Sequence, residues 1–314
     1  MNADVVCVGT SCVDVLIRGA DLSAPFTEES KQAQEVLLSV GGDATNQAIV
    51  LQRLGVNVRL LTGFGNDDAS RFIQNYLHNA GVDIEHCTIS DNIRPSISVV
   101  VISPDGQRNF IKAGTDIRFK QYTVDLQAVK NAEIVSLGSL FISPFYTAES
   151  IAAVIDAAKS NNALVCADVM MSPRALGLDD LKEVLPGIDY FFPNEDEARG
   201  LTGKTDPDEM ADVLLGYGIK NIIIKRGKDG CFVKNSAERF FLPAIGDDAV
   251  DTTGAGDNFA AGFIAALLEG RDFRGCCEFA AGTAGVSVQY VGAHTGVQSR
   301  KQVEDFIRKK QAAI

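Results

Sequence analysis

The stretch Asp251-Thr252-Thr253-Gly254-Ala255-Gly256-Asp257-Asn258-Phe259 leads small residues into an apolar segment that ends at Leu268. This pattern predicts the start of a helix. The first N–H groups of a helix have no partner within it, and the helix dipole adds partial positive charge there. Because Gly254, Ala255 and Gly256 carry no bulky side chain, a phosphate can approach their amides closely. The stretch therefore predicts an anion hole.

Asp257 stands at the mouth of this predicted hole. A carboxylate beside an anion site makes chemical sense as a base that orients and deprotonates the hydroxyl attacking a phosphate. The alternative is a first-turn acid that only stabilises the helix dipole. Taken alone, the Gly-Ala-Gly-Asp pattern favours the second interpretation.

A second stretch, Gly41-Gly42-Asp43-Ala44-Thr45-Asn46-Gln47-Ala48, opens another predicted helix that runs to Leu54. Its paired glycines permit a hinge. Asn46 lies one turn into the helix and can offer a donor and an acceptor to a vicinal diol. By itself Asn46 is equally typical of a structural helix start, but the two stretches together favour a catalytic site.

Around these stretches, short apolar runs alternate with amphipathic segments, which is typical of an α/β fold with a doubly wound, mainly parallel sheet. The predicted strands of this sheet are 5–9, 58–64, 134–137, 164–168, 190–193, 222–225 and 231–234. The predicted helices are 45–54, 69–80, 148–160, 207–217, 257–268, 273–290 and 302–311.

Four further segments break this rhythm and read as extended strands: 13–17, 36–40, 96–102 and 107–112. The last two are joined by Ser103-Pro104-Asp105-Gly106, in which proline presets φ and Asp-Gly supports a tight reversal. We expect these strands to form a small separate sheet that acts as a lid.

The two glycine-containing stretches resemble the two signatures of the PfkB family of carbohydrate kinases, which have the ribokinase-like fold. The first covers Gly41–Gly65 and the second Asp251–Ile264. The resemblance implies one ribokinase-like α/β domain over 1–314, with lid strands inserted at about 12–40 and 95–115. It also implies transfer of the γ-phosphate of ATP to an exocyclic hydroxymethyl group of a pentose, ketohexose or sugar acid such as 2-keto-3-deoxygluconate.

The resemblance assigns the following roles to residues of this chain. Asp257 is the catalytic base, and the amides of Gly254, Ala255 and Gly256 form the anion hole. The residues expected to bind the sugar are Asp14, Gly42, Asp43 and Asn46.

A second group of residues is expected to serve the nucleotide and the metal ions. Asn194 and Glu197 match an Asn-x-x-Glu element that organises Mg²⁺ and the phosphates, with Glu197 acting through water. Asn194 is also a candidate helix N-cap. The segment with Lys225, Gly227 and Gly230 matches a loop that passes the nucleotide, and Asp251 is a candidate ligand for a monovalent cation such as K⁺.

One departure from the family pattern concerns the acceptor. Ribokinases carry a sugar-binding acid after the mid-chain strand, whereas this chain reads Gly138-Ser139-Leu140-Phe141. The missing acid argues against ribose in particular and leaves Phe141 as a candidate to stack on a ring. Together with Ser143-Pro144, this segment also has some likeness to adenosine kinases, so a nucleoside kinase is the alternative.

Composition narrows the class of partner. The net charge of −12 argues against nucleic acid and anionic membranes, which need a basic surface. Seven scattered cysteines without a C-x-x-C pair suggest free thiols in a reducing cytoplasm. The expected partners are a small-molecule sugar and, from the resemblance, a second copy of the chain bound through the lid.

Two rival functions have some support in the sequence. Ala198 followed by Gly203-Lys204-Thr205 satisfies a relaxed phosphate-loop pattern, but such a loop must follow a strand and open a helix, and here it would end one. A sugar-sensing protein without catalysis would not need the intact Gly-Ala-Gly-Asp stretch.

Overall fold

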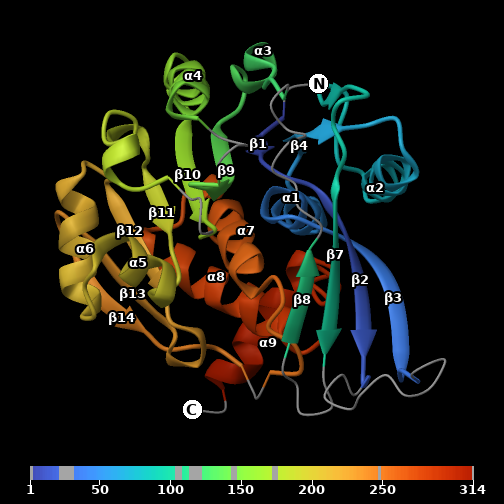
Figure 1. The fold of residues 1–314 in the computed structure, drawn as a ribbon. Coiled ribbons are helices and arrows are strands. Elements are labelled where there is room, and N and C mark those ends of the chain that lie inside the picture. The colour runs from blue at the N-terminus through green and yellow to red at the C-terminus, as the bar shows by residue number, and fades with distance from the viewer. Residues whose placement is uncertain are drawn as a thin grey trace.

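The structure is a computed structural model that describes residues 3–20, 32–102, 108–112, 122–142, 147–171, 176–246 and 249–312. Two sheets dominate these residues, and Figure 1 shows the smaller one standing beside the end of the larger. The turn predicted at 103–106 and Ser143-Pro144 lie outside the described residues.

The large sheet has the strand order β14-β13-β12-β11-β10-β9-β1-β4. The pairs from β4 to β12 are parallel, and β13 and β14 continue the sheet antiparallel. All seven predicted strands are present, and β14 was not predicted. The strands are β1 (Val5–Val8), β4 (Val58–Leu61), β9 (Ile134–Leu140), β10 (Leu164–Val169), β11 (Tyr190–Phe192), β12 (Asn221–Lys225), β13 (Cys231–Asn235) and β14 (Arg239–Leu242).

Helices cover both faces of the large sheet. Successive strand residues therefore belong alternately to two buried clusters, one on each face. Val5 and Cys7 contribute to one cluster, and Val6 and Val8 to the other. Both faces are apolar, as expected for buried parallel strands. The helices are α1 (Asp43–Arg53), α2 (Asp68–Asn79), α3 (Leu126–Val129), α4 (Ala148–Lys159), α5 (Glu195–Thr202), α6 (Pro207–Gly216), α7 (Ala255–Leu268), α8 (Phe273–Ser287) and α9 (Arg300–Gln311).

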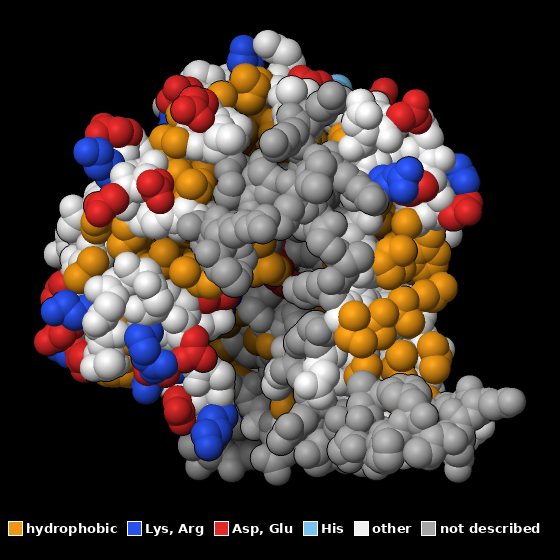
Figure 2. Space-filling model, in the orientation of Figure 1, with side chains coloured by type: hydrophobic (Ala, Val, Ile, Leu, Met, Phe, Trp, Pro, Cys, Tyr) orange, Lys and Arg blue, Asp and Glu red, His pale blue; other side chains and the backbone are white. Residues whose placement is uncertain are grey.

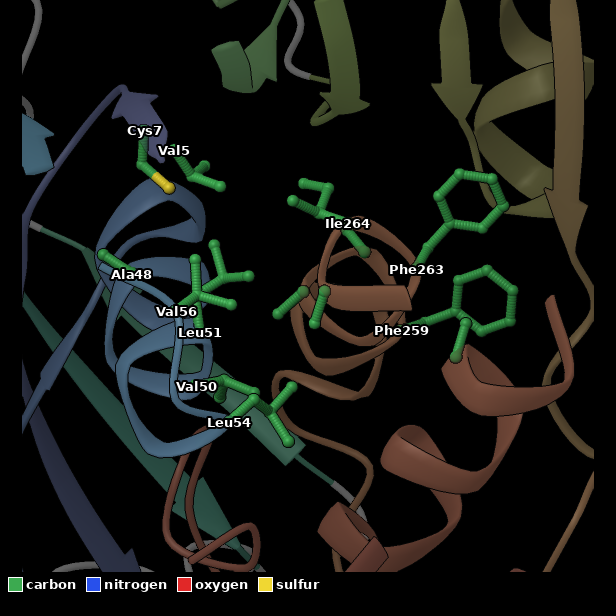
Figure 3. Packing of buried hydrophobic residues seen from close by; sticks show 14 of the residues in the cluster. Val5, Cys7, Ala48, Val50, Leu51, Leu54, Val56, Phe259, Phe263 and Ile264 are labelled. Atoms are coloured by element: carbon green, nitrogen blue, oxygen red, sulfur yellow. The ribbon is translucent and has the colours of Figure 1, made fainter. Parts of the chain in front are cut away.

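Helices α1 and α7 pack against each other on one face of the sheet. Figure 3 shows the two helices side by side, and Leu51 and Leu54 of α1 belong to the same buried cluster as Ile264 of α7. This packing brings the starts of both helices, and with them both glycine-containing stretches, to the same end of the molecule.

The small sheet has the strand order β3-β2-β7-β8, formed by the four segments predicted for it. Its inner face packs on the rest of the molecule through Leu16, Val100 and Ile102. Within the described ranges, no helix has both the length and the apolar character needed to cross a bilayer. The small sheet contains β2 (Cys12–Arg18), β3 (Glu35–Gly41), β7 (Ser96–Ile102) and β8 (Arg108–Lys112), and a separate short pair contains β5 (Gly63–Phe64) and β6 (Thr88–Ile89).

Candidate active site

The start of α7 is held by a tight turn that only glycine fits well. Gly254 is the N-cap with φ of 70°, and a Cβ there would lie 2.4 Å from the carbonyl oxygen of Ala293. Asn258 donates from Nδ2 to that same carbonyl at 2.6 Å and to the Gly254 carbonyl at 2.8 Å. The loop around Ala293 therefore fixes the direction in which α7 begins.

The amides at this helix start are only partly as predicted. The Ala255 N–H donates to the carbonyl of Thr252 at 3.2 Å, because the left-handed turn at Gly254 folds the chain back on itself. The first N–H that bonds back along the helix is that of Asn258, to Gly254 at 2.9 Å. In the described residues, two of the three predicted amides, Gly254 and Gly256, are therefore left for an anion.

Asp257 lies in the first turn of α7 and is buried, with 7% of its surface exposed. Asn46 of α1 donates from Nδ2 to its Oδ2 at 2.7 Å. Burial, followed by the nearby carboxylates of Asp43 and Asp168, raises the pKa of Asp257 well above its ordinary value. The two glycine-containing stretches thus meet in one hydrogen bond between side chains 211 positions apart.

A pocket with a volume of about 200 Å³ opens in front of this helix start. Its wall combines backbone at the start of α7 with acidic side chains from several strand and helix ends. The lining residues are Asp43, Asp168, Val169, Met170, Asn194, Glu197, Lys225, Thr252, Gly254, Ala255, Gly256 and Asp257.

Lys225 is the cation of this pocket wall. Its Nζ lies 2.8 Å from Oδ1 of Asp168, and both side chains are largely buried. Burial alone would lower the pKa of Lys225, but the carboxylates of Asp168 and Glu197 outweigh it, so the pKa is raised and the side chain stays protonated. Burial raises the pKa of Glu197 to about 7, an effect that Lys225 only partly offsets.

Asn194 and Glu197 form a reciprocal cap at the start of α5. The Asn194 side chain accepts from the N–H of Glu197 at 2.8 Å, and the Glu197 carboxylate accepts from the N–H of Asn194 at 2.7 Å. The structural alternative for Asn194 is therefore correct. Both residues also line the pocket, and the cap fixes how their side chains are presented to it.

The residues predicted to bind the sugar lie on both sides of the Gly41-Gly42 pair, where β3 leads into α1. Gly42 caps α1 with φ of 101°, and a Cβ there would lie 2.3 Å from the carbonyl oxygen of Thr10. Asp14 lies in β2 of the small sheet, where a Cβ on Gly41 would approach its Oδ2 to 2.1 Å. Asp43 reaches the pocket from the first turn of α1.

Phe141 was wrongly proposed as a ring-stacking residue. It is fully buried, and its ring packs edge-on against Phe191 at a centroid distance of 6.2 Å. Ser139, two residues earlier, has a φ of 58° and donates from its hydroxyl to the carboxylate of Asp43. The end of β9 therefore contributes a polar contact to the pocket wall through Ser139, and the residue that follows the strand, Phe141, is buried in the core.

Six residues assigned to ligands lie outside the lining of this pocket: Asp14, Gly42, Asn46, Gly227, Gly230 and Asp251. Gly227 and Gly230 form the turn between β12 and β13, where a Cβ on Gly230 would lie 1.9 Å from the carbonyl oxygen of Leu242. Asp251 accepts from the N–H groups of Thr253 and Gly292, both at 2.9 Å. Asp251 thus ties the turn before α7 to the loop that supports Gly254.

The phosphate-loop alternative is inconsistent with the local structure. Gly203 ends α5 with φ of 68°, so Lys204 follows a helix rather than opening one. The Lys204 ammonium lies 3.6 Å from Glu209 and is partly exposed. A loop that cradles phosphate needs the amides of a helix start, whereas this segment follows a helix end.

Sequence reasoning missed Asp168 and Ser139. Asp168 is an acid near the carboxyl end of a buried parallel strand, and ligands in open α/β folds bind outside the carboxyl ends of such strands. That position was a usable signal. Ser139 offered none, because its contact with Asp43 depends on an unusual backbone conformation.

Comparison with known proteins identifies the family. The family model described as pfkB family carbohydrate kinase matches residues 2–300. The chain therefore belongs to the PfkB family of carbohydrate kinases.

Relatives of similar identity carry different substrate names. An ATP-dependent 6-phosphofructokinase from Thermoanaerobacterium thermosaccharolyticum is 28% identical over 92% of this chain and 89% of its own. A ribokinase from Haemophilus influenzae is 28% identical over 91% and 94%. A nucleoside kinase from Methanothermobacter thermautotrophicus is 27% identical over 94% and 93%. These names support a kinase and leave the acceptor unresolved.

Solved structures share the whole fold. The ribokinase of Thermotoga maritima has a TM-score of 0.80 at 26% identity, covering 98% of this chain and 99% of its own. The ribokinase of Arabidopsis thaliana, solved with ribose and ATP, has a TM-score of 0.83 at 27% identity with the same coverage. A further neighbour from E. coli, in complex with ATP and Mg²⁺, has a TM-score of 0.80 at 21% identity over 98% and 99%. The chain therefore has the ribokinase-like α/β fold.

Proposed function

We propose that this protein is an ATP-dependent sugar kinase. It transfers the γ-phosphate to an exocyclic hydroxymethyl group of a pentose, a ketohexose or a sugar acid such as 2-keto-3-deoxygluconate. The single-domain arrangement, with the small sheet as a lid, and the cytoplasmic location are part of the same proposal. A nucleoside kinase is the second candidate, favoured by the nucleoside kinase among the relatives.

The observation that carries the proposal is the environment of Asn46. Its Nδ2 is engaged by Asp257, while its Oδ1 is buried without a hydrogen-bond partner among the described residues. A buried acceptor without a partner is costly, so such an atom calls for a ligand. A substrate hydroxyl can donate to Oδ1 of Asn46 and lie beside Asp257, at the start of α7.

The chemistry follows from this placement. The hydroxyl oxygen attacks the γ-phosphorus, the bond from that phosphorus to the bridging oxygen of ADP breaks, and the hydroxyl proton passes to Asp257. The raised pKa of Asp257 brings it closer to that of an effective base at neutral pH. The Gly254 and Gly256 amides stabilise charge on the phosphoryl group, whose transfer depends mainly on positioning and electrostatics.

The pocket also suits Mg²⁺. Its acids supply the oxygen ligands that Mg²⁺ prefers. Burial raises the pKa of Glu197, the carboxylates of Asp168 and Asp43 add to this, and a cation would offset their negative charge. No group of three or more metal-binding side chains occurs in the described residues, so phosphates and waters must complete the coordination. Glu197 would hold such a water, and the ion would neutralise phosphate charge.

A coupled assay of ADP release tests the proposal. We expect turnover with one class among free sugars, sugar phosphates, sugar acids and nucleosides, in the presence of Mg²⁺. Parallel reactions with and without K⁺ test the monovalent cation proposed near Asp251. Turnover confined to nucleosides would establish the second candidate, and absence of turnover across all classes would contradict the proposal.

Replacement of Asp14 tests the sugar site on the small sheet. We expect Asp14→Ala to weaken acceptor binding about tenfold or more, because a hydrogen bond to a charged group contributes about 1.5–3 kcal/mol. Calorimetry without ATP measures this directly. Glu35→Ala is the matched control, since Glu35 is an exposed acid at the far end of the neighbouring strand. Equal affinity in the wild type and Asp14→Ala would remove Asp14 from the site.

We also propose a homodimer formed through the outer face of the small sheet. Leu38, Val15, Val99 and Ile111 lie opposite one another across the four strands and so share this face. Leu38 and Ile111 are each 61% exposed, and Figure 2 shows hydrophobic side chains gathered over this part of the molecule. A patch of this kind on a sheet face is typical of a protein interface, and a second copy offers the same apolar surface.

A charge on the outer face should separate the two copies. We expect light scattering to give twice the chain mass of 33.5 kDa for the wild type and a single chain mass for Leu38→Glu. Ile89→Glu is the control, because Ile89 is 59% exposed but lies outside the small sheet. A monomeric wild type would show that no such dimer forms.

A further inference from the structure

Lys225 ends β12, and its ammonium is fixed inside the pocket wall. The side chain is 14% exposed, and its Nζ lies 2.8 Å from Oδ1 of Asp168, whose side chain is 4% exposed. A buried ion pair costs desolvation and contributes little net stability. This pair therefore invites a functional explanation.

The ammonium lies against the first turn of α7. A Cβ built on Gly256 would come within 2.9 Å of Nζ of Lys225. The missing side chain at Gly256 leaves room for that ammonium beside the amides that are expected to receive a phosphoryl group. The Lys225 ammonium and the partial positive charge at the start of α7 therefore lie side by side at Gly256.

A chain of hydrogen bonds fixes the partner of this lysine. Asp168 accepts from the N–H of Val169 at 2.8 Å and lies 3.5 Å from Nε2 of Gln47. Gln47 in turn accepts from the hydroxyl of Ser136 at 2.6 Å. Because Gln47 follows Asn46 in α1, the same helix turn holds both the proposed acceptor contact and the partner of Lys225.

The charges of the side chains around the pocket indicate what the Lys225 ammonium can do. Asp43, Asp168, Glu197 and Asp257 surround the pocket together with Lys225. Negative charge from a triphosphate would add to this crowding. An ammonium has three N–H donors, so Lys225 can keep its bond to Asp168 and still donate to a phosphoryl oxygen.

We propose that Lys225 is a catalytic residue, whose ammonium donates hydrogen bonds to the γ-phosphoryl group as it moves from ATP to the acceptor, and that Asp168 positions this ammonium. The inference rests on the proposed kinase function and gives it a further group. Lys225 stays protonated throughout, and the proton of the acceptor still goes to Asp257. If Lys225 instead belonged to a loop that only passes the nucleotide, it would contact ADP and ATP equally.

Lys225→Met separates these assignments. We expect kcat to fall about 10²-fold or more, as for loss of one donor to a developing oxyanion, with an unchanged acceptor KM. Affinity for an ATP analogue with a β,γ-imido bridge should fall at least about tenfold, while affinity for ADP stays the same. Lys220→Met is the control, because Lys220 lies just before the other end of the same strand and pairs with Asp189.

Lys225→Met leaves the Asp168 carboxylate without its cation. A second variant separates the effect of that buried charge from the loss of the ammonium. Lys225→Met with Asp168→Asn removes both charges, and we expect its kcat to match that of Lys225→Met alone, since Asp168 acts through Lys225. Asp168→Asn alone should lower kcat without changing ADP affinity. Equal losses of ADP and analogue affinity, or wild-type kcat in the double variant, would overturn the inference. A wild type that binds no analogue and phosphorylates no acceptor would instead contradict the proposed function itself.

Discussion

Asp257→Asn should lower kcat at least about 10²-fold while leaving acceptor binding nearly intact, because general base catalysis contributes about 10²–10⁴ in rate. The asparagine keeps the shape of the side chain and an oxygen that can accept from Nδ2 of Asn46. It loses the ability to take a proton. Steady-state kinetics together with calorimetry of the acceptor, without ATP, measure the two effects separately.

The same variant should be more stable than the wild type. Burial and neighbouring carboxylates raise the pKa of Asp257 in the folded state, so between its unfolded and folded pKa values the folded chain binds more protons. Wild-type stability therefore falls as pH rises through that window. Because the substituted asparagine cannot ionise, we expect the Tm advantage of the variant to grow with pH.

Asp68→Asn is the control for the simpler interpretation of Asp257 as a helix-dipole acid. Asp68 is also a first-turn acid, at the start of α2, and its side chain is 99% exposed. Its removal should cost at most about 1 kcal/mol of stability and leave kcat unchanged. If Asp257→Asn behaved like this control, with slightly lower stability and normal turnover, its assignment as the base would be wrong.

The sequence predicted the architecture well because the fold depends on local patterns. Each parallel strand is a short apolar run, and the four polar-alternating strands of the small sheet follow their own period. β14 escaped prediction because Arg239–Leu242 is a short edge strand whose pairing with β13 is long-range information. Its register is set by a partner strand rather than by its own four residues.

Site residues could be predicted where they belong to a sequence motif. They could not be predicted where contacts between residues far apart in the sequence bring them together. The glycines and Asp257 can be recognised from their spacing in the sequence. The bond between Lys225 and Asp168 joins residues 57 positions apart, so spacing could not reveal it. Phe141 failed for a different reason: an aromatic residue after a strand suits either a ligand or the core, and burial against Phe191 decided for the core.

Gly256→Ala should abolish most activity without harming the fold. Gly256 lies in the first turn of α7 without the positive φ that would strain an alanine, and alanine is favoured over glycine in helix interiors by about 1 kcal/mol. Its Cβ, however, would lie 2.9 Å from Nζ of Lys225 and so displace the ammonium that is proposed to contact the phosphoryl group. We expect kcat to fall about 10²-fold, with an unchanged or higher Tm.

Gly216→Ala provides the matched control, because Gly216 ends α6 and a Cβ there would meet no atom within 4 Å. It should raise the Tm slightly and leave kcat as in the wild type. Gly254→Ala is a poor substitute for the test, since φ of 70° and the Ala293 carbonyl at 2.4 Å would distort the turn itself. Wild-type turnover in Gly256→Ala would mean that no phosphoryl group approaches this helix start. Activity lost together with stability would mean only that the turn had collapsed, so circular dichroism must accompany the kinetics.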